Sequence, residues 1–93
     1  MEVERQVLIE GSGRCGSIWY CEGPLRIEFD WEIGGACVAL IWGNALRQLR
    51  DSGSVTVDRA QEILSFVARQ AVEQKAPSCA FEIDEERCEI TIG

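Results

Sequence analysis

Histidine is absent from this chain of 93 residues, and lysine occurs once, as Lys75. Without histidine, the chain has no Ser–His or Cys–His nucleophile pair and no imidazole for general acid–base catalysis. A net charge of -7 also leaves no cluster of cations to bind a phosphate backbone. The composition therefore disfavours an enzyme and direct binding of nucleic acid, and it implies no cofactor.

A complete disulfide framework and the common metal-binding cysteine spacing are also missing. Five cysteines cannot all pair, and no two are spaced as C-x-x-C. We therefore expect reduced thiols, with Cys37, Cys79 and Cys88 packed in the core. A zinc site made by Cys15, Cys21, Cys79 and Cys88 is the alternative, but it lacks the usual paired spacing.

Long hydrophobic runs are missing as well, since none approaches the roughly 20 residues that cross a bilayer. The chain starts with Glu2 and Glu4 instead of a basic segment and an apolar signal core. We therefore expect a cytoplasmic protein without membrane attachment. With 46% hydrophobic residues, a chain of this length supports one modest core, so we expect a single domain over residues 1–93.

Residues 11–17 are rich in glycine and contain the spacing G-x-G-x-x-G of a dinucleotide-binding loop. That fingerprint requires a helix to begin at the third glycine, Gly16. Residues 17–22 instead alternate like a strand, and Pro24 follows. We therefore interpret the segment as a flexible connection.

Alternation on both sides of Gly23-Pro24 predicts a β-hairpin from residues 17–22 and 25–33. A type II′ turn suits this dipeptide, because glycine takes the positive φ at its first central position. The register then pairs Glu22 with Leu25, Tyr20 with Ile27, Ile18 with Phe29, Trp19 with Glu28, Cys21 with Arg26, and Ser17 with Asp30. Ile18, Tyr20, Ile27, Phe29, Trp31 and Ile33 form its apolar face.

The opposite side of this hairpin combines Trp19 with the acids Glu28, Asp30 and Glu32. A tryptophan among charges is a common composition of binding hot spots. A solvated strand face is the simpler interpretation, and three carboxylates at two-residue spacing also suit a divalent metal or acid–base site.

The rest of the chain completes an α+β pattern. Residues 2–10 alternate like a strand, and residues 36–42 are apolar throughout, which is typical of a central strand covered on both faces. Residues 45–50 suit a short helix, a strand or irregular structure. From the N-cap Thr56 to Pro77, apolar residues recur at helical spacing.

Residues 79–92 predict a final hairpin with its turn centred on Glu85 and Glu86. In that register Glu82 and Glu89 lie outward and directly opposite each other, where like charges destabilise a strand pair. A basic partner would relieve this repulsion.

The predicted fold is thus an antiparallel sheet of four to six strands, packed on one long helix in the C-terminal half and followed by a final β-hairpin. One long helix covers only one side of such a sheet. We expect a second copy of the chain or residues 45–50 to cover the other side, and of these two we favour a homodimer.

All of the surplus negative charge belongs to two short stretches. Residues 20–33 contain four acids and one arginine, and residues 79–93 contain five acids and one arginine; elsewhere acids and bases are equal in number. Charge that is concentrated on a folded surface steers a partner of opposite sign. The pattern therefore indicates binding of a basic protein.

A series of motifs spans about residues 7–70. They are the run Trp19-Tyr20-x-Glu22-Gly23, a strand closing at Glu32-x-Gly34, an apolar strand through Ile41, and a helix with Asp58-Arg59 and Ile63-Leu64. This arrangement resembles a family of small bacterial immunity proteins. Members of that family are encoded beside polymorphic toxins and neutralise them by direct binding. The resemblance implies non-catalytic inhibition, but it assigns no contact residues, and the acidic segment 79–92 departs from the family pattern.

We therefore predict an acidic inhibitor that occupies the basic groove of a toxin, such as a nuclease. Its candidate partner-binding residues are Trp19, Glu28, Asp30, Glu32, Glu82 and Glu89. Two alternatives remain: a phage-encoded anti-defence inhibitor that imitates the charge of nucleic acid, and a small metal-dependent domain that uses the carboxylates of residues 28–32.

Overall fold

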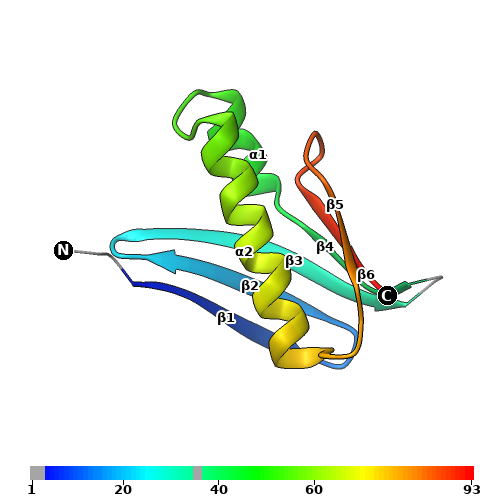
Figure 1. Ribbon diagram of the computed structural model, residues 1–93. Helices are drawn as coiled ribbons and strands as arrows, with labels where there is room; N and C mark the ends of the chain where they lie inside the picture. Colours follow the sequence, from blue (N-terminus) through cyan, green and yellow to red (C-terminus); the bar gives the residue numbers. More distant parts are fainter. Residues whose placement is uncertain (1–3, 35–36) are drawn as a thin grey trace.

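Six antiparallel strands form one sheet in the computed structural model, which describes residues 4–34 and 37–93 (Figure 1). The elements are β1 (Arg5–Ser12), β2 (Cys15–Glu22), β3 (Leu25–Gly34), β4 (Cys37–Trp42), α1 (Asn44–Asp51), α2 (Val57–Lys75), β5 (Phe81–Asp84) and β6 (Glu89–Ile92). The strand order across the sheet is β1-β2-β3-β4-β6-β5. The predicted α+β class is confirmed, with a long helix on the sheet and a strand pair at the C-terminal end.

Helix α2 covers one side of the sheet and begins and ends as the sequence predicts (Figure 1). The Thr56 hydroxyl accepts a hydrogen bond from the backbone N–H of Arg59 at 3.1 Å, and the helix ends at Lys75, two residues before Pro77. Its buried residues are Ala60, Ile63, Leu64, Val67, Ala68 and Ala71. Beside them, the Phe66 ring packs edge-on against Tyr20, with 5.9 Å between the ring centroids. This stripe packs against the apolar side of the sheet in one continuous core.

Helix α1 lies beside β3 and contacts α2, so it joins the same core. Of the three possibilities that the sequence left open for residues 45–50, the helix is confirmed. Leu46 is fully buried, and Gly43 abuts the Phe29 ring so closely that a Cβ atom there would lie 2.5 Å from a ring carbon. Residues 45–50 therefore do not cover the second side of the sheet.

The glycine-rich segment is not a flexible connection, so that prediction is wrong. Strands β1 and β2 continue through it to a two-residue turn, with Ser12 opposite Cys15. Gly11 lies opposite Gly16, and a Cβ atom on Gly11 would approach the Gly16 Cα to 2.7 Å. Here glycines permit close packing instead of mobility, because the Trp31 indole lies against this pair and donates a hydrogen bond to the Glu10 carbonyl at 3.0 Å.

The hairpin of β2 and β3 has the predicted register at every pair, from Glu22 opposite Leu25 to Ser17 opposite Asp30. Gly23 has φ +58°, as its place in the turn requires. The first strand runs over Arg5–Ser12 instead of residues 2–10. Residues 2 and 3 of the predicted first strand, and the side chain of Cys37, lie outside the described part of the chain.

The final hairpin forms with a register different from the prediction. Asp84 lies opposite Glu89, and Glu82 lies opposite Thr91, so the two glutamates do not face each other. The reason is a four-residue connection, residues 85–88, in which Cys88 adopts φ +55°. Cys88 is nevertheless fully buried and Cys79 is partly buried against the core, as predicted.

Strand β4 lies inside the sheet, between β3 and β6, as its apolar sequence predicts, and neither helix covers its second face. Ile41 packs into the helix-covered core. Leu40 and Trp42 alternate with it on the other side, where they are only partly buried. The sheet therefore has one covered side and one bare side.

Candidate functional site

The side of the sheet that faces away from both helices forms one surface, which we call the open face. Residues directly opposite each other on neighbouring strands point to the same side, so the strand pairing defines its members. They are Gln6, Leu8, Glu10 and Ser12 on β1; Cys15, Ser17, Trp19 and Cys21 on β2; Arg26, Glu28, Asp30 and Glu32 on β3; Leu40 and Trp42 on β4; Glu89 and Thr91 on β6; and Glu82 and Asp84 on β5. Neither α1 nor α2 covers this face.

All of the candidate partner-binding residues lie on the open face: Trp19, Glu28, Asp30, Glu32, Glu82 and Glu89. The sequence assigned them to two separate hairpins, and strands β4 and β6 join these hairpins into one surface. One row across the sheet is Asp30, Trp42, Glu89 and Asp84, and the next is Glu32, Leu40, Thr91 and Glu82. Because neighbouring strands lie about 4.8 Å apart, the Cα atoms of Asp30 and Glu89 are about 10 Å apart.

The open face has a large excess of negative charge. It carries the carboxylates of Glu10, Glu28, Asp30, Glu32, Glu82, Asp84 and Glu89 and a single cation, Arg26. Asp84 has a partner, since the Arg87 guanidinium lies 4.0 Å away, and Glu28 accepts a hydrogen bond from the Ser17 hydroxyl at 3.0 Å. Asp84 is the only one of the seven with an ion pair; within residues 4–34 and 37–93, the remaining six, Glu28 included, form none. Such a surface attracts cations.

Trp19 is partly buried on this face and has neighbours on both strands beside it. Leu8 lies opposite on β1 and Glu28 opposite on β3. The Arg26 guanidinium lies over the indole, 5.3 Å from the ring centroid. This cation–π contact holds Arg26, the single cation among the residues of the open face, against the Trp19 ring.

The other two tryptophans lie on opposite sides of the sheet. Trp42 lies on the open face between Asp30 and Glu89. Trp31 packs against the core on the helix side. Trp19 and Trp42 are therefore two partly buried indoles that lie among carboxylates. The strand spacing places their Cα atoms about 12 Å from each other.

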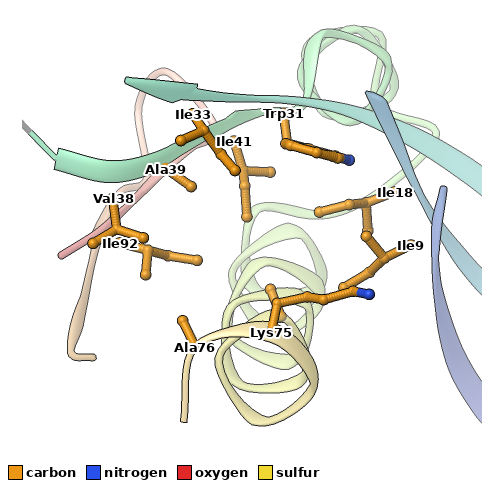
Figure 2. A pocket seen from close by; sticks show the side chains of 11 residues that line it. Ile9, Ile18, Trp31, Ile33, Val38, Ala39, Ile41, Lys75, Ala76 and Ile92 are labelled. Atoms are coloured by element: carbon orange, nitrogen blue, oxygen red, sulfur yellow. The ribbon is translucent and has the colours of Figure 1, made fainter. Parts of the chain in front are cut away.

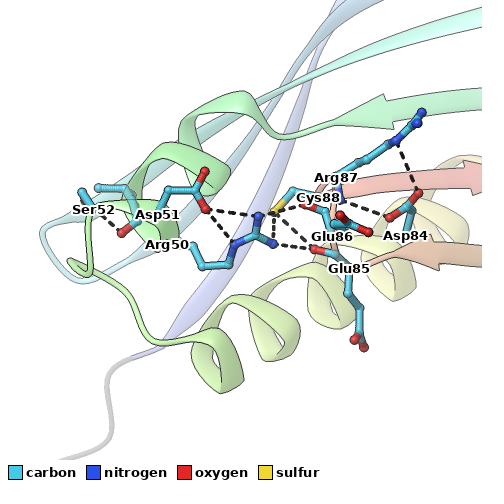
Figure 3. A network of polar contacts seen from close by, with 9 residues as sticks. Arg50, Asp51, Ser52, Asp84, Glu85, Glu86, Arg87 and Cys88 are labelled. Atoms are coloured by element: carbon cyan, nitrogen blue, oxygen red, sulfur yellow. Dashed lines mark hydrogen bonds and ion pairs between the residues drawn. The ribbon is translucent and has the colours of Figure 1, made fainter.

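Sequence reasoning missed the residue that positions the acidic end of this surface, Arg50 of α1 (Figure 3). Its guanidinium donates hydrogen bonds to the backbone carbonyls of Glu85 at 2.6 Å and Glu86 at 2.8 Å. Gln61 of α2 adds a bond of 2.8 Å to the Glu85 carboxylate. These bonds tie the connection between β5 and β6 to both helices. No local pattern signals a contact between residues 35 positions apart.

The buried thiol of Cys88 belongs to the same cluster. Arg50 donates to its sulfur at 3.4 Å, and the Cys88 carbonyl accepts a bond from the Gly43 N–H at 2.9 Å. Burial raises the pKa of the Cys88 thiol, and the nearby charge of Arg50 opposes that rise. The thiol is therefore a structural group without nucleophilic character.

The described residues of the open face form no candidate metal site. In the described part of the chain, no three His, Cys, Asp or Glu side chains come together in a way that could hold a metal ion. Cys15, Cys21, Cys79 and Cys88 are free thiols, at separate places in the fold. The open face presents two indole rings, those of Trp19 and Trp42, surrounded by carboxylates.

Comparison with protein-family models, with curated proteins and with solved structures found no match to this chain. Of the helices described, none is long and apolar enough to span a membrane.

Proposed function

We propose that this protein is a non-catalytic inhibitor that binds a basic protein partner through its open face, in the manner of the immunity proteins that its sequence resembles. The observation that carries the proposal is the union of both acidic hairpins on one uncovered side of the sheet. The partner class is a toxin whose substrate groove is cationic, as the groove of a nuclease is.

The charge balance of the face supports a cationic partner. Six carboxylates without an ion pair repel one another, and a groove lined with arginine and lysine would neutralise them on contact. Complementary charge of this kind accelerates association to about 10⁸ M⁻¹s⁻¹ or more at low salt. Trp19 and Trp42 supply the apolar contact that would slow dissociation once the surfaces meet.

We also propose a cytoplasmic location. The four cysteines whose side chains the structure describes are all free, although small domains exported to oxidising compartments commonly depend on disulfides. An inhibitor kept in the compartment where a toxin is made would protect its own cell.

The test is capture of partners from a native-host extract at low salt by the immobilised protein, identified by mass spectrometry. Two charge reversals are compared with the parent chain: Glu32→Lys on the open face and Glu73→Lys on the exposed side of α2. Each changes the net charge equally, so only position differs. We expect a cationic toxin to be retained by the parent and by Glu73→Lys, and to be lost from Glu32→Lys.

A purified partner must also lose its toxic activity when one equivalent of this protein is added. A captured protein that Glu32→Lys retains as well as the parent would contradict the assignment of the open face. A partner that stays fully active in the complex would contradict inhibition.

A further inference from the structure

On the side of the sheet opposite the open face, an apolar cavity of about 240 Å³ opens at the C-terminal end of α2 (Figure 2). Its walls include Ile9 and Ile18 from β1 and β2, Trp31 from β3 and Ile92 from β6. Figure 2 shows these side chains pointing into one space between the sheet and the last turn of α2.

The cavity exists because small residues stand where the core needs large ones. Ala71 and Ala76 form its helical wall, and Ala39 is the β4 residue directly opposite Ile92. At its rim Ile33 and Val38 are 43% and 44% exposed, which is unusual for side chains of their size. The rim therefore leaves apolar surface in water that an occupant would cover.

One charged group lines this cavity, the only lysine of the chain. Lys75 is the last residue of α2, and Figure 2 shows its side chain running along the wall. Its ammonium group forms no ion pair within the described residues. An unpaired cation at an otherwise apolar cavity is complementary to a ligand with an apolar body and an anionic end.

We propose that this cavity binds a medium-chain fatty acid, with the alkyl chain among the isoleucines and the carboxylate at the ammonium of Lys75. The size fits: a cavity of about 150 Å³ holds the six carbons of benzene, so this one holds about eight to ten carbons. The site is separate from the open face and does not depend on the function proposed for that face.

Chain length gives the first test, by isothermal titration with hexanoate, octanoate, decanoate and dodecanoate. Each methylene buried in the cavity strengthens binding about fourfold. Affinity should therefore rise steeply from hexanoate to octanoate and level off beyond decanoate, where the chain outgrows the cavity. An affinity that keeps rising to dodecanoate indicates nonspecific partition onto apolar surface and overturns the proposal, as does the absence of saturable binding.

The second test concerns the head group, by comparing octanoate with 1-octanol. The net charge of -7 repels an anion, so tighter binding of octanoate must come from a local cation. Lys75→Gln should weaken octanoate about fivefold and leave octanol unchanged. Arg69→Gln removes the same charge from an exposed position of α2 that does not line the cavity, and it should change neither ligand. Equal loss of octanoate in both variants would overturn the role of Lys75.

The third test fills the cavity. Ala39→Ile places three carbons in it while keeping a residue suited to a strand, and it should weaken both ligands at least tenfold. If that variant does not fold, Ala76→Leu at the end of α2 serves instead. Unchanged binding in a folded variant would show that the ligand lies elsewhere. If neither the parent nor the filled variant binds either ligand, and filling abolishes self-association of the protein, a second copy of the chain occupies the site and the proposal is overturned.

Discussion

If the acidity of the open face is kept for a partner, removing one of its charges should make the free protein more stable. Asp30 is the best position, because it lies near the centre of the face and none of its contacts is an ion pair. Its Cα is about 7 Å from those of Glu28 and Glu32, and about 10 Å from those of Glu10 and Glu89. In water, each pair at these distances repels by about 0.4 to 0.6 kcal/mol.

The four repulsions amount to about 2 kcal/mol before screening. The unfolded chain retains part of this repulsion, so we expect Asp30→Asn to raise the free energy of unfolding by about 1 kcal/mol at low salt. At physiological ionic strength the Debye length is about 8 Å, and the gain should fall below about 0.5 kcal/mol.

The assay is urea unfolding at low and at physiological salt. The control is Glu62→Gln, which removes the same charge from a carboxylate that pairs with Arg59 at 2.9 Å and with Arg5 at 3.5 Å. Because that carboxylate has cationic partners, its loss should destabilise the protein, by about 0.5 kcal/mol. An Asp30→Asn variant that is less stable than the parent, or whose gain does not depend on salt, would refute the reasoning.

Four further outcomes follow from the structure. Trp19→Ala should weaken partner binding by about 2 kcal/mol, mainly through faster dissociation measured by surface plasmon resonance. Full affinity in a folded variant with both Trp19→Ala and Asp30→Lys would rule out the open face as the binding surface. Arg50→Met should lower the free energy of unfolding by about 2 kcal/mol, because two charge-assisted bonds to carbonyls are lost; a change within about 0.5 kcal/mol would refute the positioning role. Burial raises the pKa of the Cys88 thiol, so its contribution to stability should be constant below the ordinary thiol pKa of 9.0 and be lost as pH rises above it. Urea titrations should show a smaller decline above that pH in Cys88→Ala than in the parent. A homodimer through the open face would bring like charges together, so sedimentation should show about 10.4 kDa at low salt and association only when salt is raised.

The elements that the sequence predicts correctly are those set by local chemistry. The Gly23-Pro24 turn determines the register of its hairpin, because only one two-residue turn type suits that dipeptide. Thr56 and Pro77 bound α2 for equally local reasons. The errors arise where distant residues decide the outcome. The glycines at 11 and 16 look like a mobile linker until Trp31 packs against them.

In the candidate site, too, local patterns predict part of the arrangement and contacts between distant residues decide the rest. Alternation alone places the acids of each hairpin outward, but it cannot reveal that the two hairpins share a surface. That depends on β6 pairing with β4, which brings residues about 50 positions apart in the chain to adjacent strands. The four-residue connection of the last hairpin is likewise held by a distant residue, because Arg50 donates hydrogen bonds to the carbonyls of Glu85 and Glu86.

Solubility does not explain why the unpaired acids gather where they do, because acids placed on any exposed surface keep a protein soluble. On the helix side, Glu22 pairs with Arg59, and Glu62 pairs with both Arg5 and Arg59, whereas Asp58 and Glu73 form no ion pair within the described residues. On the open face, six carboxylates have none within the described chain, and the one cation there lies over Trp19. The unpaired carboxylates are therefore most concentrated on the open face, where a partner can reach several of them at once. A cationic protein that covers Trp19 and Trp42 would supply the missing partners to these carboxylates and bury the indoles in the same step.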